Sequence, residues 1–519
     1  MEDALAGDAL SPRAQRVAVG ATFLVCLAVR LATIGAPALD RTAWKEIDYI
    51  QISSNYWRHG YDFTCPEIAW PAEDPRCTAM ELPLVPFIAS FGYPVLGLTP
   101  LSVRWISLVS FVLLPLTLYG LVRRELGPLV ACLAAFACAA MPLYHPFGRF
   151  QYSEPPMILC SALALHFFAK WLDSDSRVHW FGAMGAFSLA VALKLEPLYL
   201  LLPIGWLAFR RFRWNWRAYR GAGTLVAVSL LLPTIWYGWA FHLGRTSIDV
   251  FGVFGGHDKM QTLAMLTTLS WYRIMRWRVM SLILGGVAGT LLALAGLWAA
   301  LLLRRASVFA AWLAAIAISF VIVAEGNIDA PYRQLPSVPP LAVFVAFGAI
   351  ALGAAIRTAT DLDRPRGAVR PRLTAVFAAL VVATALPGAR WKETWRTDPL
   401  QPWHPPQWDL AQAIRANSAP GDLLIALGEY TVHKGGNDLS PVLYHYSGLQ
   451  GWTLQAGEWN EARVEQLRTR GATHLALSSM SHQPGAHEFV DTLRRHYPVL
   501  FEDSANGLVL LDLRTPADG

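Results

Sequence analysis

The sequence predicts a mainly α-helical protein that crosses the membrane many times and carries a small C-terminal α/β domain. Of its 519 residues, 54% are hydrophobic and only 15% are charged, whereas about a quarter of the residues in soluble domains are charged. Eleven segments have the apolar character and approximate length of a spanning helix. After about Trp395, short apolar runs alternate with amphipathic ones, which is typical of an α/β fold.

The predicted spans determine how the first 390 residues are divided. We expect them at about 16–37, 101–122, 128–143, 155–172, 178–194, 197–210, 220–242, 281–303, 306–323, 335–356 and 373–388. The segment 84–98 is apolar but short, and it contains Pro86 and Pro94, so we expect a helix along the membrane interface. These ranges give a membrane domain over 1–390, a first outer loop over 38–100 and a C-terminal domain over 391–519.

Arginine clusters predict the orientation of the chain. Counted from an inside N-terminus, the inner loops hold clusters such as Arg123-Arg124 and the five arginines between 210 and 220. The positive-inside rule therefore predicts a multi-pass protein of the inner (plasma) membrane. Its N-terminus is expected to be cytoplasmic and its C-terminal domain periplasmic or extracytoplasmic. Because the formal net charge of +6 lies in short runs between apolar segments, it does not indicate nucleic-acid binding.

The C-terminal domain is predicted from its apolar runs. GDLLIALG, ATHLALSS and GLVLLDL are expected to be short buried strands. Between them, EARVEQLRTRG and HEFVDTLRRHY have helical periodicity and basic last turns.

Polar and acidic residues concentrate in the loop Trp44–Leu84, after the first span. On a helix, one face would hold Asp48, Gln51, Asn55 and Arg58, and another would hold Trp44, Ile47, Ile50 and Trp57. We therefore expect an interfacial helix that presents Asp48. This carboxylate is either a general base or part of an ordinary solvated surface.

The same loop holds two further features. Glu81, in the run Glu81-Leu82-Pro83-Leu84, either ligates a divalent cation, holds a basic partner or is an ordinary loop acid. Cys65 and Cys77 can form a disulfide if the loop faces an oxidising compartment, as the predicted topology implies. The other four cysteines lie in apolar segments and are expected to be small core residues.

The segment 148–156 (GRFQYSEPP) joins two spans on the predicted outer face. Arg149 can bind a phosphate, and Glu154 can orient a substrate or a metal, with Gln151 as a further substrate contact. Alternatively, Glu154 is simply an acid favoured at the start of a helix, followed by Pro155 in its first turn.

Two more pairs of polar residues lie at span ends. Lys194 and Glu196 interrupt an apolar run, so Lys194 is either a phosphate ligand or one half of a structural pair with Glu196. Tyr332 and Arg333 precede a late span. Arg333 can bind a phosphate, with Tyr332 as a substrate contact, or the two anchor the chain at the interface.

Together these motifs resemble the GT-C-fold membrane glycosyltransferases. The nearest branch is the bacterial one related to lipid A aminoarabinose transferase and protein O-mannosyltransferases. The resemblance rests on the acid in the first outer loop, the acid-x-Pro-x run, the Gly-Arg…Glu-Pro segment, a lysine near a span end and a late Tyr-Arg-x-Leu-Pro-x-x-Pro stretch. It covers about Arg16–Gly388, and the C-terminal domain also looks like the outer domain of many bacterial members.

The resemblance implies an inverting transfer at the outer membrane face, from a polyprenyl-phosphate sugar to a lipid or glycan acceptor. It assigns catalytic acids to Asp48, Glu81 and Glu154. Such a monophosphate donor requires no cofactor, although a divalent metal can bind at Glu81. Many relatives read Asp-Glu where this chain has Ile47-Asp48, so Glu46 is a rival base.

The resemblance also bears on the sugar. Relatives of the aminoarabinose type have Lys-Pro-Pro where this chain has Leu82-Pro83-Leu84, which argues against aminoarabinose. Two other functions are also compatible with the sequence: a glycolipid transporter and a scaffold protein. A glycolipid transporter would place ionisable residues near the middle of several spans, whereas here they gather at one face, the predicted outer one. A scaffold would use the α/β domain to bind envelope glycans.

Overall fold

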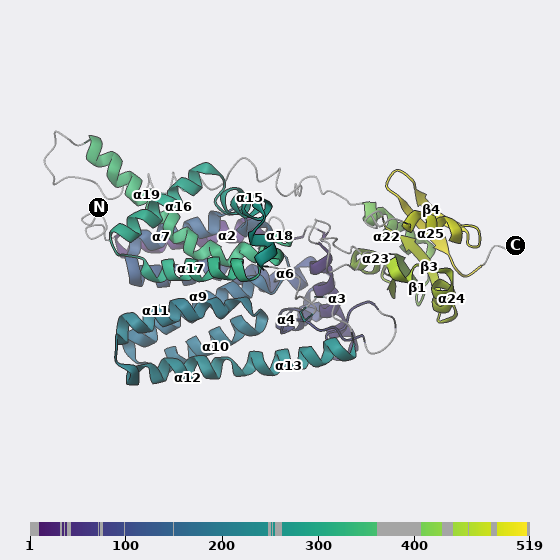
Figure 1. The fold of residues 1–519 in the computed structure, drawn as a ribbon, viewed down its shortest axis with the longest axis horizontal. Helices are drawn as coiled ribbons and strands as arrows, with labels where there is room; N and C mark the ends of the chain where they lie inside the picture. Colours follow the sequence, from purple (N-terminus) through teal and green to yellow (C-terminus); the bar gives the residue numbers. More distant parts are fainter. Residues whose placement is uncertain are drawn as a thin grey trace. The chain divides into compact units, whose positions relative to one another are not determined.

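The computed structural model describes residues 10–31, 34–35, 37–38, 43–70, 72, 76–97, 99–148, 150–247, 251, 253–254, 262–360, 406–427, 440–454, 456–478 and 485–515. The protein is mainly helical with one small sheet (Figure 1). It forms two compact units. The helical unit comprises Met1–Ile34, Arg104–Gly238 and His257–Thr394, and the sheet unit comprises Gly35–Val103, Trp239–Gly256 and Trp395–Gly519.

The helical unit contains apolar helices and short connecting turns. Its α-helices are α2 (Pro12–Leu31), α6 (Pro100–Leu126), α7 (Pro128–Ala140), α8 (Tyr144–Phe147), α9 (Glu154–Ser174), α10 (Arg177–Leu193), α11 (Leu201–Phe212), α12 (Arg220–Ser229), α13 (Leu231–Thr246), α14 (Thr262–Leu266), α15 (Leu269–Trp277), α16 (Val287–Leu302), α17 (Ser307–Ile322), α18 (Ala324–Asp329) and α19 (Val338–Thr360). In the described residues, tighter or wider turns join them: η1 (Glu196–Leu200), η2 (Trp216–Tyr219), the π-helix η4 (Arg278–Ile283) and η5 (Pro331–Ser337). Helices α6 and α13 run on into the sheet unit.

Several helices are long and apolar enough to cross a membrane. In the described part of the chain these are Pro100–Leu126, Glu154–Ser174, Trp216–Thr246 and Pro331–Gly353, with a fifth if the bent pair Leu269–Ile283 and Val287–Leu302 is one span. Shorter apolar helices cover Pro128–Ala140, Arg177–Leu193 and Ser307–Ile322. The expected span at 373–388 lies outside the described residues. The count of eleven spans therefore stays a prediction.

Close helix packing explains two glycines of the helical unit. A Cβ atom on Gly296 of α16 would lie 1.8 Å from the carbonyl oxygen of Phe344 on α19. A Cβ on Gly348 would lie 2.0 Å from the carbonyl oxygen of Leu292. Only glycine lets the two backbones approach this closely. Figure 1 also shows α10 between α9 and α12, which agrees with the contacts of α10 to both.

The sheet unit combines the first outer loop with the C-terminal residues. Its loop helices are α3 (Ala43–His59), α4 (Leu84–Ser90) and α5 (Tyr93–Leu96), so the segment 84–98 forms two short helices instead of one. Its C-terminal helices are α22 (Pro406–Asn417), α23 (Ser440–Ser447), η6 (Ala456–Glu458), α24 (Glu461–Thr469) and α25 (Ala486–Leu493). The proposed domain division at residue 390 remains a prediction.

The sheet has five strands in the order β2-β1-β3-β5-β4. They are β1 (Leu423–Leu427), β2 (Gln450–Leu454), β3 (Ala472–Leu477), β4 (Val499–Asp503) and β5 (Leu508–Asp512). β1 pairs in parallel with β2 and β3, whereas β5 runs antiparallel to β3 and β4. The three predicted strands are therefore confirmed as β1, β3 and β5. Their inward residues pack with helices α24 and α25 in one core that includes Ile425, Leu475, Val464 and Val490.

Candidate active site

The predicted site residues fall into two groups, one in each compact unit. Asp48 and Glu81 belong to the sheet unit, and Glu154, Lys194 and Arg333 belong to the helical unit. Arg149 lies outside the described residues. Each group has its own chemistry.

Helix α3 carries Asp48 in the sheet unit. The helix ends at His59, and the following Gly60 has a φ of 102°, in the left-handed region that favours glycine after a helix. Asp48 is 0% exposed, and Glu46 is also fully buried. Asp48 is therefore not part of a solvated surface, which was one of the two alternatives for it. A buried carboxylate must be held by neighbouring polar groups or act chemically.

The polar face of α3 is covered by two other segments. Gln51 donates from Nε2 to the carbonyl oxygen of Pro441 at 3.2 Å and accepts from the amide of Ala69 at 3.3 Å. Asn55 donates to the carbonyl oxygen of Glu67 at 2.9 Å. These bonds give the side-chain amides of Gln51 and Asn55 protein partners, so this part of the polar face is buried, whereas Arg58 is exposed.

Glu81 is linked to α3 through a tyrosine. The hydroxyl of Tyr49 lies 3.5 Å from a carboxylate oxygen of Glu81, a long hydrogen bond. The ammonium of Lys45 lies 5.8 Å from the centroid of the Tyr49 ring, within the range of a cation–π contact. The acid–proline run is thus connected to the helix that carries Asp48, one residue before Tyr49.

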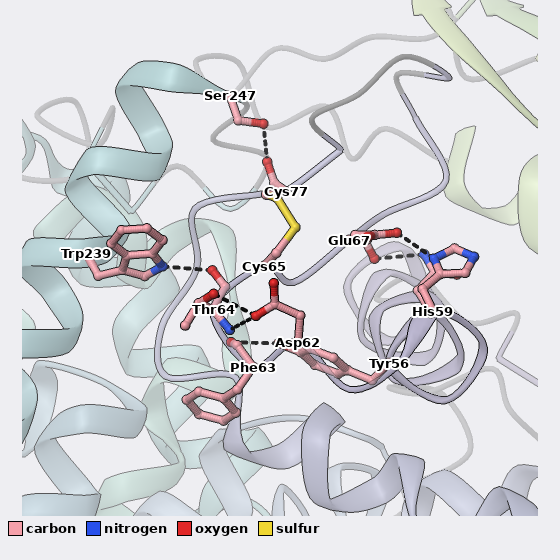
Figure 2. The surroundings of a disulfide bond; sticks show 11 residues. Tyr56, His59, Asp62, Phe63, Thr64, Cys65, Glu67, Cys77, Trp239 and Ser247 are labelled. Carbon is pink, nitrogen blue, oxygen red and sulfur yellow. Dashed lines mark hydrogen bonds and ion pairs between the residues drawn. A yellow bond between two sulfur atoms is a disulfide. The ribbon is translucent and has the colours of Figure 1, made fainter.

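Figure 2 shows the disulfide that closes the rest of this loop. Cys65 and Cys77 are bonded, with Cα atoms 4.8 Å apart and a sequence separation of 12. Hydrogen bonds also hold the loop at or next to each cysteine. The indole of Trp239 donates to the carbonyl oxygen of Thr64 at 2.7 Å, and the Ser247 hydroxyl donates to the carbonyl oxygen of Cys77. The disulfide therefore fixes the middle of the loop that holds α3 and Glu81.

A buried network of alternating charges lies in the helical unit. The ammonium of Lys194 is 2.9 Å from a carboxylate oxygen of Glu154, and these side chains are 6% and 0% exposed. Lys194 is also 3.7 Å from Glu196, which in turn is 3.3 Å from the guanidinium of Arg333. Two carboxylates and two cations alternate, so the formal charge of the four residues is zero.

Helix ends bring these four residues together. Glu154 is the first residue of α9, with prolines in the first turn as the sequence predicts, and Lys194 is the C-cap of α10 with an extended backbone. Glu196 begins η1, and Arg333 lies in η5. Because backbone ends need polar partners and charged side chains avoid mid-membrane positions, helix ends are where such a network is stable.

Lys194 has the carboxylate partners that one of its two predicted roles requires, and its role as a phosphate ligand stays a prediction. Lys194 is part of an ion-pair network, and Glu154 is nearer to its ammonium than Glu196 is. A phosphate that binds Lys194 or Arg333 must therefore compete with a carboxylate already in place.

Sequence reasoning missed Arg278, which holds the segment before Arg333. Arg278 is buried in η4 and donates to the carbonyl oxygens of Asn327 and Ile328, at the end of α18. Gln334 donates to the side-chain oxygen of Asn327 at 2.8 Å. Arg278 thus satisfies carbonyl groups that a helix end leaves without intrahelical partners. In the sequence Arg278 is the last of three arginines between 273 and 278, directly before an apolar run, and nothing distinguishes it from the other two.

A cluster of aromatic rings lies beside Lys194. Tyr332 contacts Phe147 and Tyr152, with ring centroids 6.0 and 5.6 Å apart, and the ammonium of Lys194 lies 5.4 Å from the Tyr332 centroid. Gln151 is fully buried. The Lys194–Glu154 pair is buried, which strengthens its electrostatic interaction, whereas Arg333 and Glu196 are partly exposed.

The described residues contain no group of three or more His, Cys, Asp or Glu side chains placed to hold a metal ion. Metal binding at Glu81 stays a prediction, and Glu81 belongs to no such group in the described residues.

Comparison with known proteins identifies the fold. Residues 78–239 match the family model described as dolichyl-phosphate-mannose-protein mannosyltransferase. This segment includes Glu81, Glu154 and Lys194 and begins after Asp48. No match to the chain is found among curated proteins.

Solved structures match nearly the whole chain. The crystal structure of ArnT from Cupriavidus metallidurans bound to undecaprenyl phosphate has a TM-score of 0.61 and 15% identity, over 96% of this chain and 97% of that chain. The Archaeoglobus fulgidus oligosaccharyltransferase tethered with an acceptor peptide has a TM-score of 0.55 and 12% identity, over 98% and 74%. Arabinofuranosyltransferase AftD from Mycobacteria has a TM-score of 0.51 and 16% identity, over 98% and 40%. The predicted resemblance is therefore confirmed, and the chain has the fold of the GT-C membrane glycosyltransferases.

Proposed function

We propose that this protein is a membrane glycosyltransferase that moves a sugar from a polyprenyl-phosphate donor to a lipid or glycan acceptor of the cell envelope. The observation that carries the proposal is the fold that it shares, over 96% of its length, with ArnT bound to undecaprenyl phosphate. That complex supports a lipid-phosphate donor. The tethered acceptor peptide of the oligosaccharyltransferase supports an acceptor held on the same fold.

In the proposed reaction Asp48 is the general base. Its carboxylate takes the proton of the acceptor hydroxyl, whose oxygen attacks the anomeric carbon. The bond from that carbon to the phosphate oxygen breaks, and the polyprenyl phosphate leaves with the electron pair. Attack from the opposite side inverts the anomeric centre. The complete burial of Asp48 supports this role, since a buried carboxylate in a helix of a transferase fold is a candidate catalytic group.

Cations must stabilise the charge that develops on the leaving phosphate. We assign this to Lys194 and Arg333, with Arg149 as a third cation from the sequence. Glu196 contacts both Lys194 and Arg333, so the donor phosphate would exchange with the Glu196 carboxylate. Glu154 holds Lys194 in place at 2.9 Å.

The location follows from the predicted topology. We propose an inner-membrane protein with a cytoplasmic N-terminus, transfer at the outer face, and a periplasmic or extracytoplasmic C-terminal domain. The positive-inside distribution of arginines supports this orientation.

A transfer assay tests the function directly. Purified full-length protein in nanodiscs is given polyprenyl phosphates that carry labelled hexoses or pentoses, with an envelope extract as the acceptor source. We expect label to move to an acceptor from at least one lipid-phosphate sugar and not from nucleotide sugars. A parallel liposome assay follows translocation of a fluorescent glycolipid. Translocation without transfer would favour the glycolipid transporter, although the four networked charges lie at helix ends instead of mid-span. Glycans missing from a deletion strain would identify the acceptor.

A further inference from the structure

The turn between α11 and α12 concentrates cations and tryptophans. This segment, Phe209–Arg220, is called the Arg-Trp turn below. It contains five arginines and two tryptophans in twelve residues, FRRFRWNWRAYR. Figure 1 shows α11 and α12 at one end of the helical unit, where the chain reverses through this turn.

Three guanidinium groups of the Arg-Trp turn are exposed and unneutralised. Arg213, Arg217 and Arg220 are exposed, and no ion pair joins them to a carboxylate in the described part of the chain. Arg210 differs, because it lies 2.7 Å from a carboxylate oxygen of Glu125. A local excess of positive charge is therefore open to an anionic ligand.

The two tryptophans are also exposed. Trp214 and Trp216 are 73% and 72% exposed. Their rings are 6.3 Å apart, and Trp216 lies 5.8 Å from Tyr219. Large apolar rings left open in this way, beside cations, mark a surface that another apolar or interfacial phase covers.

The backbone of the turn is well defined by its own bonds. Arg213 has a φ of 52°, which ends α11, and its amide donates to the carbonyl oxygen of Phe209 at 2.9 Å. The hydroxyl of Tyr219 donates to the carbonyl oxygen of Arg213 at 2.9 Å. The side chains are thus presented from a built turn, which lowers the entropy lost when a ligand orders them.

The Arg-Trp turn lies at the end of a candidate membrane span. Trp216–Thr246 is long and apolar enough to cross a membrane, and Trp216 and Arg217 are its first residues. A residue at the end of a span lies at the depth of the lipid headgroups. Tryptophan is enriched there, and clustered arginine attracts anionic lipids.

We propose that the Arg-Trp turn is a binding site for anionic phospholipid headgroups. The guanidiniums of Arg213, Arg217 and Arg220 bind headgroup phosphates, for which their geometry is suited. Trp214 and Trp216 insert between the headgroups. This interaction is independent of catalysis and anchors one end of the α11–α12 hairpin.

The test compares two lipids on the purified full-length protein. Phosphatidylglycerol is titrated into micelles of protein, detergent and phosphatidylcholine, and the thermal unfolding midpoint and the lipids retained in native mass spectrometry are recorded. The variant is Arg213→Gln/Arg217→Gln/Arg220→Gln. The matched control is Arg304→Gln/Arg305→Gln, which changes two exposed arginines on the turn between α16 and α17.

We expect phosphatidylglycerol to raise the midpoint of the wild type and of the control. The triple variant should lose this specific rise, with an affinity for phosphatidylglycerol roughly a hundredfold lower, at about fivefold per arginine. An undiminished phosphatidylglycerol effect in the triple variant would overturn the proposal. So would a wild type that responds to polyglutamate and not to phosphatidylglycerol, which would indicate an acidic protein partner. If the triple variant does not fold, Trp214→Ala/Trp216→Ala gives the same test, because it too should weaken retention of phosphatidylglycerol.

Discussion

Replacing Lys194 with methionine should destabilise the helical unit more than replacing either of its carboxylate partners. Lys194 is 6% exposed and contacts Glu154 at 2.9 Å and Glu196 at 3.7 Å. Its removal leaves two acidic groups near one another without the cation between them. In Glu154→Gln, by contrast, the ammonium of Lys194 still has the Glu196 carboxylate.

The magnitude follows from the burial of the pair. Breaking a buried ion pair by removing one partner typically costs about 3–5 kcal/mol, because the remaining charge is desolvated. We expect the loss of unfolding free energy to be near the upper end of this range for Lys194→Met and near its lower end for Glu154→Gln. The double variant Glu154→Gln/Lys194→Met should cost less than the sum of the two by about 2 kcal/mol or more, since the charges are removed together.

Unfolding in a reversible detergent titration, followed by circular dichroism, gives the free energies for this double-mutant cycle. Lys170→Met is the matched control, because Lys170 lies on α9 and is exposed. Its effect should stay within about 0.5 kcal/mol. Additive free energies in the cycle, or equal costs for Lys194→Met and Lys170→Met, would refute the coupling that we infer from the network.

Three further predictions concern the loop, the donor and pH. Cys65→Ser/Cys77→Ser should lower stability by about 3 kcal/mol, as expected for a loop of this length; free thiols at both positions in protein extracted without reductant would contradict the pairing. Glu196→Gln should lower the KM for the lipid-phosphate donor several-fold with less effect on kcat, because Arg333 loses a competing carboxylate; an unchanged or higher KM would contradict the exchange. Burial, aided by Arg58, lowers the pKa of His445 from 6.5 to about 4. The unfolded chain therefore binds the proton first, so stability should be constant above about pH 6.5 and fall by at most about 3 kcal/mol towards pH 4; the loss should be absent in His445→Gln.

The strands show what sequence pattern can predict. β1, β3 and β5 are the three inner strands of the sheet, and their continuous apolar runs identified them. β2 and β4 lie at the two edges. β2 contains Gly451, and β4 is partly exposed and ends in two acids. Edge strands are buried on fewer sides, so their sequences carry a weaker apolar signal.

The ion network shows where prediction from sequence ends. The adjacency of Lys194 and Glu196 along the chain was visible and indicated a pair. Glu154, however, is 2.9 Å from Lys194 only because α9 begins where α10 ends. Arg278 binds backbone carbonyl groups, which every residue has, so no spacing of side chains could reveal its role.

The burial of α3 is a similar case. Periodicity predicted the helix and its polar face, and α3 extends over Ala43–His59. The residues that cover this face, such as Pro441 and Ala69, come from segments far apart in the chain. A helical wheel shows which residues share a face but not whether solvent or protein lies against it.

The most direct test of the proposed mechanism is the turnover of Asp48→Asn beside that of Glu46→Gln. Both acids are fully buried on α3, so the two substitutions remove one charge each from the same helix. In the lipid-phosphate transfer assay at saturating donor, we predict that kcat of Asp48→Asn falls about 10²–10⁴-fold, as for loss of a general base. Glu46→Gln should fall less than about tenfold. Full transfer by folded Asp48→Asn, or a collapse of activity in Glu46→Gln alone, would contradict the assignment of Asp48 as the base.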